Sequence, residues 1–272
     1  MRFVLTLYQS WQKLFRSFWG LPQEGQTQTP NWQRFANPER FAKLARTLLP
    51  WLMGSAIIAA VTGTVWGLMI APPDYQQGEA MRIIYVHVPA AWMSMFVYAV
   101  MAISSAVAFI WKHPLADVAA KASAPIGAVF TALALATGML WGKPMWGAWW
   151  VWDARLTSVL ILFFLYLGYI VLWNAIEEPG RAARAARILA LVGAINIPII
   201  KFSVDWWNTL HQASSVMRMD GPTMPASMLW PLLIMALAYN LLYAAILMMR
   251  MRAEIAERRL RSIRLGLEPS PA

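Results

Sequence analysis

Six long stretches of apolar residues alternate with short polar segments along the chain. Crossing the roughly 30 Å hydrocarbon core of a bilayer takes about 20 helical residues at 1.5 Å each, and every stretch comes close to that length with almost no charge. The stretches are Leu48–Ile70, Pro89–Trp111, Ala122–Trp141, Leu156–Trp173, Ile188–Val204 and Ala226–Met249. Their apolar residues run continuously, whereas strands of a membrane barrel would alternate over about ten residues. The pattern therefore predicts an all-α, polytopic membrane protein with six transmembrane helices.

The fifth stretch gives the weakest signal for a membrane span. It is the shortest of the six, it contains Asn196 and Pro198, and Lys201 lies near its end. A single proline within a transmembrane helix is usually tolerated as a kink, because neighbouring groups satisfy the freed carbonyl. We therefore expect one kinked helix in this stretch.

Polar segments flank this six-helix domain of residues 48–249 at both ends of the chain. Near the N-terminus, apolar side chains recur on one helical face, with Lys13 and Arg16 on the other side. The apolar positions are Val4, Leu7, Tyr8, Trp11, Leu14, Phe15, Phe18 and Trp19. This pattern is typical of a helix that lies on the inner leaflet. Residues 1–47 are predicted to form such an interfacial helix and a polar linker, and residues 250–272 a basic cytoplasmic tail.

Composition supports a membrane protein and removes several kinds of chemistry. Hydrophobic residues make up 59% of the chain and charged residues only 13%, whereas soluble domains carry roughly 25% charged residues. Cysteine is absent. Its absence excludes disulfides, thiolate metal ligands, a cysteine nucleophile and covalent haem attachment through cysteine.

The net charge of +10 is explained by where the basic residues lie. Of the 23 Lys and Arg, 18 lie in the N-terminal arm, in residues 112–121, in residues 174–187 and in the C-terminal tail. Basic residues concentrate on the cytoplasmic side of membrane proteins. Both termini are therefore predicted to be cytoplasmic, with the three alternate loops outside. The tail suits contact with anionic membrane lipid, and nucleic acid is not expected as a partner.

Tryptophan is concentrated in one outer connection. Five of the 16 tryptophans fall within twelve residues, where an even distribution would place about 0.7. They are Trp141, Trp146, Trp149, Trp150 and Trp152. An aromatic belt at the headgroup level needs one or two rings per helix end, so five rings in a segment with Gly142, Pro144 and Gly147 indicate something else. Such a loop presents a broad apolar surface with indole N–H donors, which suits a large flat ligand.

Two of the three histidines lie on the same side of the membrane as these tryptophans. His87 and His211 each fall just outside a predicted span, His87 ahead of Pro89 in the first turn of the second helix. Two imidazoles from one side can ligate one haem iron axially. His113, on the inner side, is interpreted as a solvated loop residue.

Charged residues near the tryptophans supply further candidates. Arg82 and Arg155 flank the two outer segments, and a guanidinium is the preferred partner of a carboxylate such as a haem propionate. Asp153 is predicted to cap the fourth helix, because aspartate is a good N-cap and an apolar run begins three residues later.

The segment WGKPMWGAWWVWDARLTS at residues 141–158 resembles the tryptophan-rich "WWD" motif of haem-handling membrane proteins. Within that group, YVHVPAAW at residues 85–92 and DWWNTLHQ at residues 205–212 are similar to the cytochrome c maturation protein C family, the haem exporter C family. The resemblance runs from about residue 48 to about residue 250 and includes both outer histidines. The arm at residues 1–40 does not match the family.

The resemblance implies a role in c-type cytochrome biogenesis at the outer, periplasmic face of a bacterial inner membrane. Such proteins hold non-covalent haem b and present it to a membrane-anchored haem chaperone, CcmE, in a complex with the ABC-type pair CcmA and CcmB and the single-span CcmD. Carried over by position, His87 and His211 are the axial ligands of the haem iron. The other cofactor-binding positions are Trp141, Gly142, Pro144, Trp146, Trp149, Trp150, Trp152, Asp153, Trp206 and Trp207, with Arg82 and Arg155 as propionate partners. A haem carrier rather than an enzyme is expected.

Three other functions remain open from the residues. A membrane cytochrome b usually places histidine pairs at membrane depth, and no histidine lies in the middle of a predicted span. A membrane enzyme would need carboxylates such as Asp153, Asp205 or Asp220 to converge on one site. A secondary transporter would be indicated by broken helices, for which Asn196–Pro198 is the only hint.

Overall fold

The computed structural model describes residues 37–267, except residues 208, 213–214 and 217. Its α-helices are α2 (Pro38–Val65), α3 (Ile84–Trp111), α4 (Pro114–Trp146), α5 (Ala154–Ala175), α6 (Pro179–Gly193), α7 (Asn196–Trp206) and α8 (Ala226–Leu267). Six segments of this part of the chain are long and apolar enough to cross a membrane, with α6 and α7 together forming the fifth. The six predicted spans are thereby confirmed. The predicted interfacial helix lies outside the described residues.

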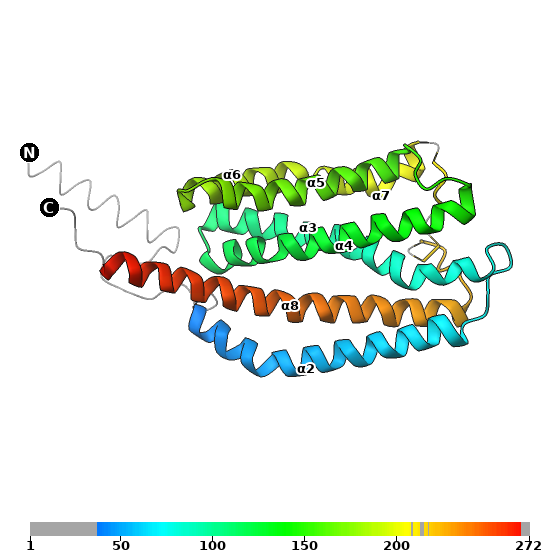
Figure 1. Cartoon of the computed structure of the whole chain (residues 1–272), viewed down its shortest axis with the longest axis horizontal. Helices are drawn as coiled ribbons and strands as arrows, with labels where there is room; N and C mark the ends of the chain where they lie inside the picture. Colours follow the sequence, from blue (N-terminus) through cyan, green and yellow to red (C-terminus); the bar gives the residue numbers. More distant parts are fainter. Residues whose placement is uncertain (1–36, 208, 213–214, 217, 268–272) are drawn as a thin grey trace, which may run out of the picture.

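The helices lie roughly parallel in one elongated bundle (Figure 1). The contacting pair α3 and α4 lies in the middle, with α5, α6 and α7 on one side and the contacting pair α2 and α8 on the other. Large side chains such as Tyr98 of α3 and Leu162 and Tyr166 of α5 are fully buried in the core of the bundle. Helix α2 contacts mainly α8 and exposes most of its apolar side chains, including Trp51, so it presents a surface suited to lipid.

Several helices begin at a polar cap followed by proline, which has no N–H to leave unsatisfied. Asn37 caps α2 ahead of Pro38, and Glu178 caps α6 ahead of Pro179. His113 caps α4 in the same way, because its Nδ1 accepts a hydrogen bond from the Ala116 N–H at 3.3 Å. His113 thus lies before the helix, as predicted, but it is half-buried and its side chain caps α4.

The second span begins earlier than predicted. Proline costs about 3 kcal/mol inside a helix, so Pro89 was expected in the first turn. Instead a 3₁₀ turn at Glu79–Ile83 leads into α3 at Ile84, and Pro89 lies within the helix. Ile84 is buried beside Tyr85, and burying an isoleucine side chain yields about 1.5–3 kcal/mol, a gain of the same order as the cost of the proline. His87 consequently lies on α3 and not in a loop.

The predicted limits of the membrane domain, residues 48 and 249, both fall inside helices. Helix α2 already includes residues 38–47, and α8 continues through residue 267 without a break at residue 249. The third span starts at Pro114, eight residues before the predicted start at Ala122. The prediction leaves out this first part of the helix because it contains the charged residues Asp117 and Lys121. These charges are compatible with a continuous helix because each is paired with a charge on another helix.

The fifth span is two helices, not one kinked helix. Helix α6 ends at Gly193, and α7 restarts at Asn196 after a turn. The ring of Pro198 would clash with the carbonyl of Ala194 in a continuous helix, so the chain places Pro198 in the first turn of a new one. The buried Asn196 amide donates to the Ser158 carbonyl at 2.8 Å and fixes this break against α5.

Candidate functional site

The tryptophan-rich segment is partly helical, which corrects the predicted loop of residues 141–155. Helix α4 continues to Trp146, with Pro144 in its last turn, and Gly147 ends it with a left-handed φ of 75°. The irregular connection is therefore shorter, and α5 starts at Ala154. Gly142 is buried in this last part of α4, where a Cβ would lie 3.1 Å from the Trp146 ring and from the Ala148 carbonyl oxygen. Glycine thus permits the chain to fold back closely here.

The imidazole of His87 reaches across from α3 to α4. Its Nδ1 lies 3.0 Å from Oγ1 of Thr137, and its ring meets Trp141 edge-on with centroids 5.7 Å apart. A Cβ at Gly138 would lie 3.1 Å from Cε1 of His87, so this glycine leaves room for the ring. Helix α4 therefore fixes the orientation of the imidazole.

The contact with Thr137 also determines which nitrogen of His87 carries the proton. The Thr137 hydroxyl donates its single proton to the Leu133 carbonyl at 2.7 Å, so toward His87 it can only accept. Nδ1 of His87 is therefore the N–H donor. The lone pair of the neutral ring is left on Nε2, the nitrogen available to a metal ion.

His211 has an equivalent arrangement on the segment between α7 and α8. Its Nδ1 lies 3.3 Å from Oδ2 of Asp153, and its ring packs edge-on against Trp146 at 4.9 Å between centroids. A carboxylate beside Nδ1 favours the proton on that nitrogen and leaves Nε2 free, as in many metal-binding histidines. Oδ1 of Asp153 accepts the Leu156 N–H at 2.7 Å, which confirms the predicted cap of α5.

The charge state of His211 follows from its surroundings. Burial lowers the pKa of His211 below its ordinary value of 6.5, and the Asp153 carboxylate opposes the shift without reversing it. The imidazole is therefore neutral at pH 7. A neutral imidazole is the form that binds a metal ion.

Most of the indoles at this end of the bundle remain accessible. Trp149, Trp152, Trp206 and Trp207 are each at least half exposed. Trp150 contrasts with them, because its Nε1–H is buried without a hydrogen-bond partner among the described residues. Because this N–H is shielded from solvent, a ligand could reach it only if the surrounding side chains moved.

Trp141 contacts the loop that precedes α3. Its Nε1–H donates to Oε1 of Gln77 at 3.1 Å, while its ring contacts His87. The indole thereby holds the residue 71–78 loop against the end of α4. Trp141 therefore positions this loop through its N–H, in addition to packing its apolar ring against His87.

The two arginines differ in their surroundings. Arg82 is paired with Glu79 and donates to the Gly67 carbonyl at 2.8 Å, at the start of the segment that leads to α3. Arg155 donates to Oγ of Ser203 at 3.2 Å and to backbone carbonyls of α7. The charge of Arg155 acts on both His87 and His211, so this guanidinium belongs to the same group of residues as the two imidazoles.

The structure thus brings the two histidines to the same end of α4, where His87 contacts Trp141 and His211 contacts Trp146. It does not join Arg82 to them by any contact that it describes. Thr137 and Gly138 were missed from the sequence. Their signal is visible in retrospect, because a threonine and a glycine lie one helical turn before Trp141 and share a helix face with it.

The carboxylates do not form an acid–base pair in the described residues. Both oxygens of Asp153 are engaged, one with the backbone of α5 and one with His211. Asp220 is exposed and pairs with Arg218 at 3.8 Å. The arrangement of Asp153 is that of a residue that positions a histidine.

Comparison with known proteins identifies close relatives over most of the chain. A family model described as heme exporter protein C matches residues 31–265, so the expectation that the whole arm at residues 1–40 falls outside the family is wrong for its last ten residues. The chain is 59% identical over 230 residues to heme exporter protein C of Bradyrhizobium diazoefficiens, covering 85% of this chain and 87% of that protein. It is 49% identical over 220 residues to heme exporter protein C of Escherichia coli K12, covering 80% and 88%. Against heme exporter protein C of Paracoccus denitrificans the identity is 44% over 230 residues, covering 84% and 95%.

Proposed function

The chain belongs to the heme exporter protein C family, and from this premise we propose that it takes part in haem export for cytochrome c biogenesis by binding haem between His87 and His211. The observation that carries the proposal is the matched state of the two imidazoles. Each has Nδ1 held by an oxygen atom, from Thr137 or from Asp153. Each therefore offers the lone pair of Nε2 at the same end of α4, which is the donor set of an axially ligated haem.

The other groups at this end fit the same ligand. Haem is a flat apolar macrocycle with two carboxylates. The exposed indoles, Trp149, Trp152, Trp206 and Trp207 among them, supply apolar contact area at low entropic cost.

Arg155 is the stronger candidate for a propionate. Its guanidinium is held by Ser203 and by α7 carbonyls, and its charge acts on both histidines. Arg82 remains a candidate from the sequence, but Glu79 already neutralises its charge. Firm binding of only one propionate, by Arg155, would suit a cargo that has to leave.

Delivery to the chaperone CcmE is the further part of the proposal. Two imidazole ligands saturate the iron and suppress oxygen chemistry, so haem is stored and not used. The exposed Trp149 and Trp152 lie in the connection between α4 and α5, where an incoming partner protein can reach them. We place this end on the periplasmic side, with CcmA, CcmB and CcmD as the partners of the complex.

The direct test is the absorption spectrum of the purified protein after incubation with haem, recorded from pH 8 to pH 5. We expect one haem per chain with a six-coordinate, low-spin spectrum at pH 7 to 8. Protonation of His211 competes with iron, and burial lowers the pKa of His211 from 6.5. Occupancy should therefore stay constant down to about pH 6.5 and fall only at more acidic pH.

Two outcomes would overturn the proposal. One is a protein that takes up no haem while circular dichroism reports an intact helical fold. The other is release with a midpoint above pH 6.5, because a histidine with a lowered pKa is already neutral there.

The exposed tryptophans are expected to matter for transfer more than for folding. Trp152 is 74% exposed, so Trp152→Ala removes little buried area and should shift the melting temperature by less than about 2 °C. Transfer of haem to purified CcmE should slow by about tenfold or more, because an exposed tryptophan at a contact surface often contributes more than 1.4 kcal/mol. Transfer is measured by the appearance of covalently bound haem on CcmE.

A matched control exists on the opposite side of the bundle. Trp51 is 76% exposed on α2, which lies across the bundle from α5 (Figure 1). Trp51→Ala should leave transfer unchanged. Equal transfer rates for both variants would exclude Trp152 from the contact with CcmE.

A further inference from the structure

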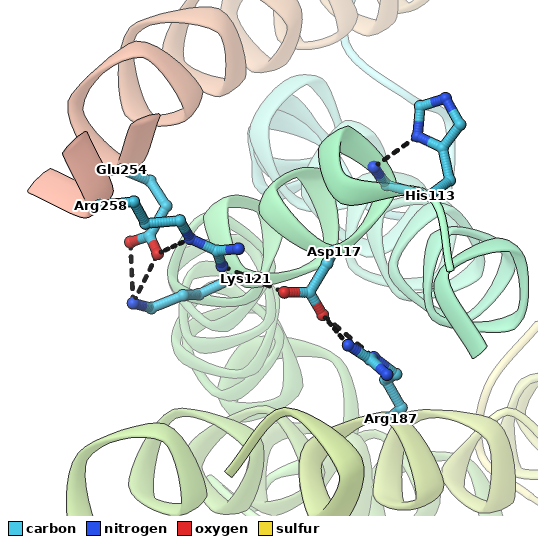
Figure 2. Close-up of polar contacts among 7 residues, drawn as sticks. His113, Asp117, Lys121, Arg187, Glu254 and Arg258 are labelled. Carbon is cyan, nitrogen blue, oxygen red and sulfur yellow. Dashed lines mark hydrogen bonds and ion pairs between the residues drawn. The ribbon is translucent and has the colours of Figure 1, made fainter. Parts of the chain in front are cut away.

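A cluster of paired charges closes the end of the bundle opposite to the histidines (Figure 2). Asp117 on α4 accepts from Arg187 of α6 at 3.0 Å and from Arg258 of α8 at 3.1 Å. Glu254 of α8 accepts from Lys121 at 2.8 Å and from Arg258 at 2.8 Å. Asp117 lies 29 residues before Trp146 on the same helix, which corresponds to about 44 Å. The cluster is therefore remote from the haem site.

A cavity of about 630 Å³ adjoins this cluster. Its lining comes from the end of α3, the start of α4, and helices α6 and α8. The lining residues are Ala108, Phe109, Lys112, His113, Pro114, Asp117, Arg184, Arg187 and Arg258. Four of these side chains are basic and only one is a carboxylate, so the cavity carries an excess of positive charge.

The excess is not neutralised within the described chain. The single carboxylate of Asp117, which is 7% exposed, is shared between the guanidinium groups of Arg187 and Arg258. Arg184 and Lys112 form no ion pair with any other described residue. Both of these side chains are exposed, so they raise the positive potential around the cavity, which suits it to an anionic ligand.

The surroundings of the cavity indicate which anion. Its apolar lining includes Phe109, and the next residues of α3, Ile110 and Trp111, are more than half exposed at the end of a membrane span. A ligand here meets basic groups beside a surface that faces lipid tails. Basic pockets between transmembrane helices are known to hold lipid headgroups, and guanidinium groups match phosphate geometry.

We propose that this cavity binds the phosphate headgroup of an anionic phospholipid. The binding fixes α3, α4, α6 and α8 to one another at the end of the bundle that the charge distribution predicts to be cytoplasmic. The proposal is independent of haem binding, because none of its residues contacts His87 or His211. It is also more specific than contact between the basic tail and the membrane, because Arg258 points into the bundle toward Asp117 (Figure 2).

The test uses the double variant Lys112→Asn/Arg184→Gln of the full chain. These two side chains line the cavity but take no part in the ion pairs of Asp117, so the fold should be kept. Asparagine suits position 112 because Lys112 has a left-handed φ of 51°. The control variant is Arg259→Gln, which removes an exposed basic side chain from the same end of α8 outside the lining.

Native mass spectrometry of detergent-purified protein with added phosphatidylglycerol reports binding. We expect the wild type and Arg259→Gln to retain the lipid, and the double variant to bind it about tenfold or more weakly. Phosphatidylcholine and inorganic phosphate should bind poorly to all three proteins. Equal phosphatidylglycerol binding by the wild type and the double variant, with melting temperatures unchanged, would overturn the proposal. So would equal binding of phosphatidylcholine, or displacement of the lipid by millimolar inorganic phosphate, which would point to free phosphate as the ligand.

Discussion

His87→Ala and His211→Ala are each expected to weaken haem binding by more than about 100-fold. Removing a partner of a metal-ligating histidine typically costs 10- to 100-fold in affinity, and removing the ligand itself costs more. The reason lies in the geometry, because α4 orients both rings by separate contacts, His87 through Thr137 and His211 through Trp146. Neither contact can bring a substitute nitrogen to the iron. Haem content per chain and the loss of the low-spin spectrum measure the effect.

The third histidine provides the control for these variants. His113 lies at the other end of α4, where it caps the helix. His113→Asn keeps a good capping residue and should retain full haem with an unchanged spectrum. Unchanged haem content and spectra in both alanine variants at the haem-site end would refute axial ligation by His87 and His211.

Asp153→Asn is expected to weaken haem binding by about 10- to 100-fold with little loss of stability. Asparagine caps helices as well as aspartate does, so its amide oxygen can accept the Leu156 N–H that Oδ1 of Asp153 accepts now. Its NH₂ group then faces His211 and donates to Nδ1. The proton of the neutral ring is forced onto Nε2, which removes the lone pair that binds iron.

The measurement is a haem titration followed by absorbance, beside a melting curve. Asp220→Asn serves as the control, because Asp220 is an exposed carboxylate that pairs with Arg218, and the haem affinity of this variant should equal that of the wild type. If Asp153→Asn bound haem as tightly as the wild type, Asp153 would be a helix cap only. If it melted far earlier, the loss of haem would report unfolding and not the tautomer of His211.

The position of His87 shows that the residues around Pro89 do not by themselves predict where α3 begins. Pro89 predicts that the second helix begins at the proline, since proline is favoured at the first helical position. The helix begins before it because Ile84 and Tyr85 pack with Met81 and with residues of α8 such as Leu232. A contact between residues that far apart in the sequence cannot be deduced from the residues around Pro89.

The sequence marks residues 141–155 as an unusual, tryptophan-rich segment, but it predicts a loop where the structure has a helix up to Trp146. Gly142 and Pro144 indicate a loop by their propensities. In the structure they lie in the last turns of α4, where Gly147 is the residue that ends the helix. Pro144 removes the hydrogen bond that an N–H at this position would donate to the Leu140 carbonyl, and the packing of Trp141 and Trp146 against the two histidines offsets that loss.

The sequence alone determined the six membrane spans, because a bilayer demands long continuous apolar helices and each such run is visible locally. It also determined the family, through the WWD segment and the segments around His87 and His211. Only the tertiary structure decided that Thr137 and Asp153 hold the two imidazoles, that Arg155 lies near both, and that a basic cavity adjoins Asp117. Those features depend on which helices pack together, and that choice is made by contacts between residues that are distant in the chain.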